Sequence, residues 1–156
     1  MTMMPCTFSR RATLAGLGAL TLVAACGPKG PGAVDLAISG QAGANPGPDG
    51  LDRPLTLQIL QLRGTASFDA ANPLALQDPA AALGADLVKA EAVTLAPGGS
   101  ASKTLVLDPA TTAVAVVAGF RNPSGKAVRA KMAVNPTAKA AFTVSVGPGG
   151  VSMAPA

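Results

Sequence analysis

Alternating apolar and polar side chains predict β-strands along most of the chain after residue 32. Val34, Leu36 and Ile38 alternate with Asp35 and Ser39, which is the two-residue period of a strand with one buried face. The same period predicts five more strands, over residues 55–62, 87–95, 102–107, 127–134 and 142–146. A seventh segment, residues 112–120, is apolar on both faces, so we expect a central strand that is covered on both sides.

Two strands carry finer detail. In residues 55–62 the apolar positions change phase after Ile59, because Leu60 and Leu62 follow the earlier series Leu55, Leu57, Ile59. A slip of one residue turns side chains to the opposite face, so we expect a bulge or bend near Ile59. In residues 127–134 the pattern predicts that Arg129 and Lys131 face water.

A helical insertion is predicted at about residues 69–84. Asn72-Pro73 and Asp78-Pro79 each provide a capping residue followed by a proline, the arrangement favoured at the start of a helix. Gly84 follows the second apolar run and is suited to end a helix. We therefore expect two short helices between strands.

The order of these elements predicts the fold class. Seven short strands joined by turns rich in Gly and Pro are typical of a mostly β protein. We expect a two-sheet antiparallel β-sandwich with a small helical insertion, formed by residues 33–156.

The N-terminal residues have a different character. Arg10 and Arg11 precede an uncharged, apolar segment over residues 12–25, and this arrangement predicts a secretory signal peptide at residues 1–25. As a helix of about 1.5 Å per residue the segment spans only about 21 Å, less than the ~30 Å needed for a permanent transmembrane helix. The twin arginines also resemble a twin-arginine export motif, so Sec and twin-arginine export both remain open. Residues 26–32 alternate Gly and Pro and are expected to form a short tether.

Cys26 is the candidate lipidation site. Val23-Ala24-Ala25-Cys26 resembles the bacterial lipobox, in which the thiol receives diacylglycerol, cleavage follows, and the new N-terminus is acylated. Cys6 lies in the segment that cleavage would remove, and lipidation accounts for the single remaining thiol of an exported protein. Gly27 in place of Asp favours the outer membrane, facing the periplasm. The alternative is ordinary cleavage after Ala25, which leaves Cys26 unmodified.

Composition argues against several functions. The chain has no histidine, and its 12 Lys and Arg residues against 8 Asp and Glu residues are scattered rather than clustered. Nucleic-acid binding is not expected without a basic patch and stacking aromatic residues. Without histidine or a free thiol we expect no catalytic residue, no metal site and no cofactor besides the lipid on Cys26. Asp49 and Asp52 share a loop, where aspartates more often form turns than bind calcium.

The ordered set of motifs resembles one family. Asn45-Pro46, Asp49-Gly50 and Arg53-Pro54 precede a strand, a helical segment and then Leu83-Gly84-Ala85-Asp86-Leu87. Pro97-Gly98 and residues 116–121, Val-Val-Ala-Gly-Phe-Arg, complete the set. In this order, behind a lipobox, they resemble the TssJ/VasD family, the outer-membrane lipoproteins of the type VI secretion system. Two positions depart from the family pattern: Leu60 where Tyr is common, and Val128 where Trp often precedes Arg.

The resemblance implies a fold, a partner and a site. It implies a transthyretin-like β-sandwich that anchors the membrane complex by binding the periplasmic domain of a TssM-type (IcmF-like) inner-membrane protein. In that family the loop between the first two strands makes much of the partner contact, and here it maps to Asn45, Pro46, Gly47, Pro48, Asp49, Gly50, Leu51, Asp52 and Arg53. A different interpretation is that these residues form an ordinary Pro/Gly connection.

Two other functional classes remain as alternatives. A lipoprotein sandwich could bind a small ligand or cell-wall glycan, but such sites usually display aromatic residues, and the chain has no Tyr or Trp. An enzyme is disfavoured by the lack of histidine. If the loop serves partner binding, replacing Asp52 and Arg53 by Ala should weaken binding and leave thermal unfolding nearly unchanged.

The lipidation hypothesis predicts the effect of Cys26→Ser. Serine cannot form the thioether to diacylglycerol, so the variant should leave the membrane and appear in the soluble periplasmic fraction. Fractionation followed by mass spectrometry of the N-terminal peptide checks this expectation. Membrane retention of Cys26→Ser, or a bare Cys26 thiol in the wild-type protein, would contradict it.

Overall fold

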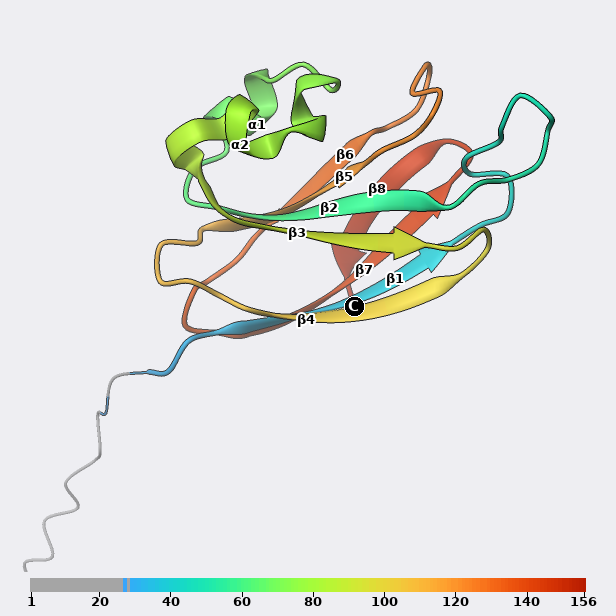
Figure 1. Cartoon of the computed structure of the whole chain (residues 1–156). Helices are drawn as coiled ribbons and strands as arrows, with labels where there is room; N and C mark the ends of the chain where they lie inside the picture. The colour runs from blue at the N-terminus through green and yellow to red at the C-terminus, as the bar shows by residue number, and fades with distance from the viewer. Residues whose placement is uncertain (1–26, 28) are drawn as a thin grey trace, which may run out of the picture.

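The computed structural model describes Gly27 and residues 29–156; the predicted signal peptide and Cys26 lie outside the described residues. Over this part of the chain eight strands form two four-stranded sheets that pack face to face (Figure 1). The strands are β1 (Ala33–Gly40), β2 (Leu55–Leu62), β3 (Leu87–Leu95), β4 (Ser100–Val106), β5 (Ala113–Ala118), β6 (Arg129–Ala133), β7 (Lys139–Gly147) and β8 (Gly150–Pro155).

The two sheets confirm the predicted mostly β, two-sheet sandwich. One sheet has the order β4-β1-β7-β8 and the other the order β3-β2-β5-β6. All neighbouring strands are antiparallel except β1 and β7, which run parallel with Val34 opposite Ala140. β8 was not predicted from the sequence; in this strand Val151 is buried while Ser152 is exposed.

The main core lies between the sheets, where the alternating apolar residues point inward. Burial of these side chains provides the main driving force that holds the sheets together. The buried set includes Val34, Leu36, Ile38, Leu55, Leu57, Ile59, Val114, Val116, Phe142, Val144 and Val146.

The phase change in β2 has a different cause from the predicted bend. Its pairing with β3 stays in register past Ile59, and the irregularity lies between Gln61 and Leu62. Leu60 and Leu62 are buried on the outer face because they pack beneath the helical insertion, together with Phe68. The expected bulge near Ile59 was therefore wrong: the strand does not turn over, but its second half is covered on both faces.

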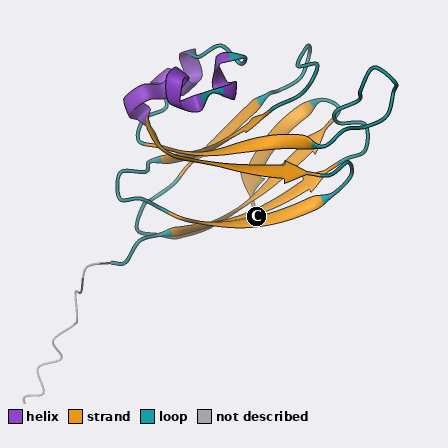
Figure 2. Cartoon of the chain, in the orientation of Figure 1, coloured by secondary structure: helices purple, strands orange, loops and turns teal. Residues whose placement is uncertain are grey.

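The helical insertion covers one end of the outer face of the second sheet, over the second half of β2 and over β5 (Figure 2). It comprises α1 (Ala66–Ala70), a 3-10 turn η1 (Ala75–Gln77), α2 (Pro79–Leu83) and a 3-10 turn η2 (Gly84–Asp86). It therefore begins before the predicted residue 69, because α1 was not foreseen. The predicted start of α2 is confirmed, since the Asp78 carboxylate accepts a hydrogen bond from the Ala81 N–H.

Arg129 and Lys131 hold this insertion to β6 and do not simply face water as expected. The Arg129 guanidinium donates hydrogen bonds to the carbonyl oxygens of Phe68, Asp69 and Ala71 at 2.7–3.0 Å. Lys131 forms an ion pair with Asp69. The last carbonyl groups of a helix lack hydrogen-bond donors within the helix. Here Arg129 of β6 supplies the donors.

β5 is buried along its whole length, as predicted for a strand covered on both sides. Its even-numbered residues face the main core and its odd-numbered residues face the insertion. Among the residues that the structure describes, no helix is long and apolar enough to cross a membrane.

Candidate partner-binding loop

Residues 41–54 carry the chain from β1 in one sheet to β2 in the other, and they fold into a tight hairpin. The Arg53 N–H donates to the Asn45 carbonyl at 3.0 Å, and the Gly47 N–H donates to the Leu51 carbonyl at 2.8 Å. Gly50 adopts a positive φ of 76° at the tip, a conformation that glycine accepts without steric cost. The loop thus has internal hydrogen bonds of its own.

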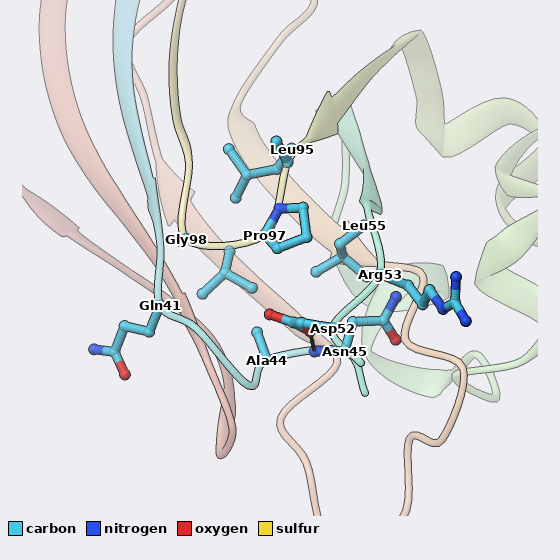
Figure 3. A pocket seen from close by; sticks show the side chains of 12 residues that line it. Gln41, Ala44, Asn45, Asp52, Arg53, Leu55, Leu95, Pro97 and Gly98 are labelled. Atoms are coloured by element: carbon cyan, nitrogen blue, oxygen red, sulfur yellow. Dashed lines mark hydrogen bonds between the residues drawn. The ribbon is translucent and has the colours of Figure 1, made fainter. Parts of the chain in front are cut away.

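The Asp52 carboxylate organises the base of this hairpin. It accepts hydrogen bonds from the backbone N–H groups of Gly43 and Asn45, each at 2.8 Å, and Figure 3 shows its contact with Asn45. The Asn45 hydrogen bond is the main cause of a lowered Asp52 pKa, and the Gly43 bond acts in the same direction. Asp52→Ala would therefore remove two hydrogen bonds from the base of the loop.

Asn45 fixes the loop to its neighbours from a buried position. Its side-chain amide donates to the Pro54 carbonyl at 3.1 Å, and its side-chain oxygen accepts from the Arg121 N–H at 2.9 Å. Asn45 is only 3% exposed, and buried polar groups in native proteins are nearly always paired in this way. Asn45 is therefore part of the frame that holds the loop in place.

The tip of the loop is exposed. Pro48, Asp49, Gly50 and Leu51 are all accessible, and the Leu51 side chain, 64% exposed, is one of the few large apolar groups on the surface. Arg53 and Asp49 form an ion pair at 2.5 Å across the tip. The nine predicted residues therefore divide into a frame, led by Asn45 and Asp52, and an accessible tip.

The space beside the loop does not favour a small ligand. A cavity between the loop base and the turn at residues 96–98 measures about 10 Å³ and is lined by Asn45, Asp52, Leu55 and Pro97, among others (Figure 3). That volume is about enough for a single water molecule. In the described part of the chain, no three His, Cys, Asp or Glu residues gather into a possible metal site.

The family comparison decides what kind of protein this is. The model of the family described as "Type VI secretion lipoprotein, VasD, EvfM, TssJ, VC_A0113" matches residues 32–149. The chain belongs to this family. The resemblance inferred from the motifs is thus confirmed, and as a structural lipoprotein of the type VI secretion system the protein is not an enzyme.

Solved structures support the same fold. The T6SS lipoprotein TssJ1 from Pseudomonas aeruginosa is 24% identical, with a TM-score of 0.74 over 81% of this chain and 97% of that one. Serratia marcescens Lip, described as a membrane bound component of the type VI secretion system, is 20% identical, with a TM-score of 0.71 over 78% and 96% of the two chains.

A third similar chain comes from a structure described as "T6SS protein TssM C-terminal domain (869-1107) from EAEC". It is 26% identical, with a TM-score of 0.63, and the match covers 80% of this chain and 98% of that one. No curated protein matches.

The hydrogen bonds to Asp52 predict a pH dependence of the loop. The folded-state pKa lies below the ordinary value of 3.8, so Asp52 stabilises the loop above about pH 3.8 and loses that effect as the pH falls through its lowered pKa. Amide chemical shifts of Gly43 and Asn45 followed by NMR should move together in this acid range. Asp52→Asn should abolish the transition, and a midpoint above 3.8 in the wild type would contradict the geometry.

Proposed function

We propose that this lipoprotein anchors the type VI membrane complex at the outer membrane by binding the periplasmic domain of a TssM-type inner-membrane protein. The contact surface is the exposed tip of the loop over residues 45–53. The observation that carries the proposal is the hydrogen-bonded loop, which presents Leu51 to solvent on a rigid base. Binding residues commonly lie on loops that a rigid scaffold holds in place.

The proposed membrane anchor precedes the start of β1, and the loop follows the end of β1. At its start Gly32 and Ala33 bond to the carbonyls of Pro136 and Ala138, while at its far end Gly40 bonds to Gly99. A strand of eight residues spans about 26 Å, so the tether and the loop lie at opposite ends of the sandwich. A protein held by its N-terminus thus directs the loop away from the membrane surface (Figure 1).

The anchor itself is proposed to be lipid on Cys26 after removal of residues 1–25. The tether from Cys26 to Gly32 reaches at most about 20 Å when extended, which keeps the sandwich near the bilayer. Gly27 after the cysteine supports delivery to the outer membrane, facing the periplasm. Confinement to a surface raises the effective concentration for a partner that reaches across the periplasm.

The proposal for the partner rests on the family and on the third structural match. That relative's description names the TssM C-terminal domain. An exposed leucine on a hydrogen-bonded loop offers apolar surface that would be removed from water in a pocket on such a partner. The Asp49–Arg53 ion pair beside it would then form part of the polar rim.

Leu51→Ala tests the proposal. Burying a leucine side chain contributes about 1.5–3 kcal/mol, so affinity for the purified TssM-type periplasmic domain should fall about tenfold or more. The melting temperature should stay nearly constant, because Leu51 is 64% exposed. Isothermal titration calorimetry and thermal unfolding provide the two measurements.

Leu74→Ala is the matched control. Within the described residues Leu74 is the other large exposed leucine, at 78%, and it lies in the helical insertion away from the loop. Its removal should leave the affinity unchanged. Equal losses in the two variants, or no binding by the wild-type protein at high micromolar concentration, would contradict the proposed function.

A further inference from the structure

Lys126, in the turn between β5 and β6, makes an unusual contact with the loop base. Its ammonium group donates to the Ala44 carbonyl at 2.6 Å and lies 4.7 Å from the centre of the Phe120 ring. Of the ion pairs within the described residues, none includes Lys126. Its charge is therefore directed to a backbone carbonyl and an aromatic face instead of a carboxylate.

The peptide group that Lys126 contacts is also bonded at its other end. The N–H of the same peptide, which belongs to Asn45, donates to the Asp52 carboxylate at 2.8 Å. A cation thus polarises the carbonyl while an anion polarises the N–H. Charge-assisted bonds are stronger than neutral ones, and bonds in a chain reinforce one another.

The same turn makes a second connection to the loop. The Arg121 N–H donates to the Asn45 side-chain oxygen at 2.9 Å. The turn belongs to the β5–β6 hairpin, and β5 is buried along its length. The loop base is therefore bonded at two points, Arg121 and Lys126, to the turn that follows the buried strand β5.

The hydrogen bonds from Lys126 and Arg121 lie at the loop base, so we expect their loss to affect the loop more than the stability of the whole fold. The Lys126 side chain is only partly buried, and the two core residues that its ammonium group contacts, Ala44 and Phe120, lie at the edge of the core, 6% and 8% exposed. Losing the ammonium group should increase local opening of the loop, which proteins undergo far more readily than global unfolding. A loop that is open part of the time binds more weakly, in proportion to its binding-competent fraction.

We infer that Lys126 is a positioning residue for partner binding: through the Ala44–Asn45 peptide it holds the loop over residues 45–53 in its binding conformation. This inference rests on the proposed function for its effect on affinity. Its effect on the loop itself is independent of any partner, so the two can be tested separately.

The first test uses the protein alone. Lys126→Met keeps most of the aliphatic stem and removes the ammonium group, so the amides of Gly43, Asn45, Gly47 and Arg53 should exchange with solvent about tenfold faster. Amides within β1 should exchange at the wild-type rate, and the melting temperature should change little. Lys131→Met is the matched control, because Lys131 pairs with Asp69 on the helical insertion and its loss should leave loop exchange unchanged.

The second test uses the purified TssM-type periplasmic domain and surface plasmon resonance. Lys126→Met should lower the affinity in proportion to the fraction of the protein whose loop stays in the binding-competent conformation, mainly through slower association. Lys126→Arg, which keeps a cationic donor, should restore part of both effects. This correspondence between exchange and affinity is not expected of a residue that only supports the fold.

Three results would overturn the inference: unchanged loop exchange in Lys126→Met, faster exchange in β1 and the loop alike, or an affinity that stays at the wild-type value although the closed fraction of the loop has fallen. Absence of binding by the wild-type protein would instead reject the proposed function. In that case the exchange data alone would still decide whether Lys126 holds the loop.

Discussion

The connection between β1 and β2 must cross from one sheet to the other, and the backbone at that crossing is buried. Ala44 and Asn45 are 6% and 3% exposed, so their polar groups must find partners within the protein. Asp52, Lys126 and the Arg121 N–H supply them. The hydrogen bonds that these buried polar groups require also hold the base of the loop, and the exposed tip is built on that base.

A second constraint is the burial of both faces of β5 and of the second half of β2 in the second sheet. β5 contacts the main core on one face and the helical insertion on the other. The insertion is in turn held by Arg129, which reaches three carbonyl oxygens around the end of α1. Part of one surface of the sandwich is thus closed by helices, while the loop and the tether lie at the two ends of β1. This separation suits a protein that is held at one end and binds at the other.

The sequence allowed the strands and the fold class to be predicted because they depend on local periodicity. Val34, Leu36 and Ile38 are buried and the residues between them are exposed. The alternation of apolar and polar residues in the sequence reflects this alternation of burial. The bend near Ile59 was predicted wrongly because the pattern cannot distinguish a reversed strand from one whose outer face becomes covered. α1 and β8 were missed because each is short, and each is held by tertiary contacts more than by its own sequence signal.

The candidate loop could be located from the sequence, but its internal division could not. Hydrogen bonds place Asn45 and Asp52 in the frame of the loop, and the sequence alone does not distinguish them from the exposed residues of the tip. Lys126 could not be assigned to this loop from the sequence, because it lies 82 positions from Ala44 and belongs to an ordinary Pro-Ser-Gly turn. Such pairings depend on which turns the topology brings together, and no local motif reports them.

The most direct test of the central claim is a hydrogen-exchange footprint of this protein with and without the purified TssM-type periplasmic domain. If the loop tip is the contact surface, amides over residues 47–51 should be protected on binding, while those on the outer face of β4 and β1 should not change. Protection confined to the helical insertion or to the outer sheet face, with the loop exchanging as in the free protein, would contradict the account.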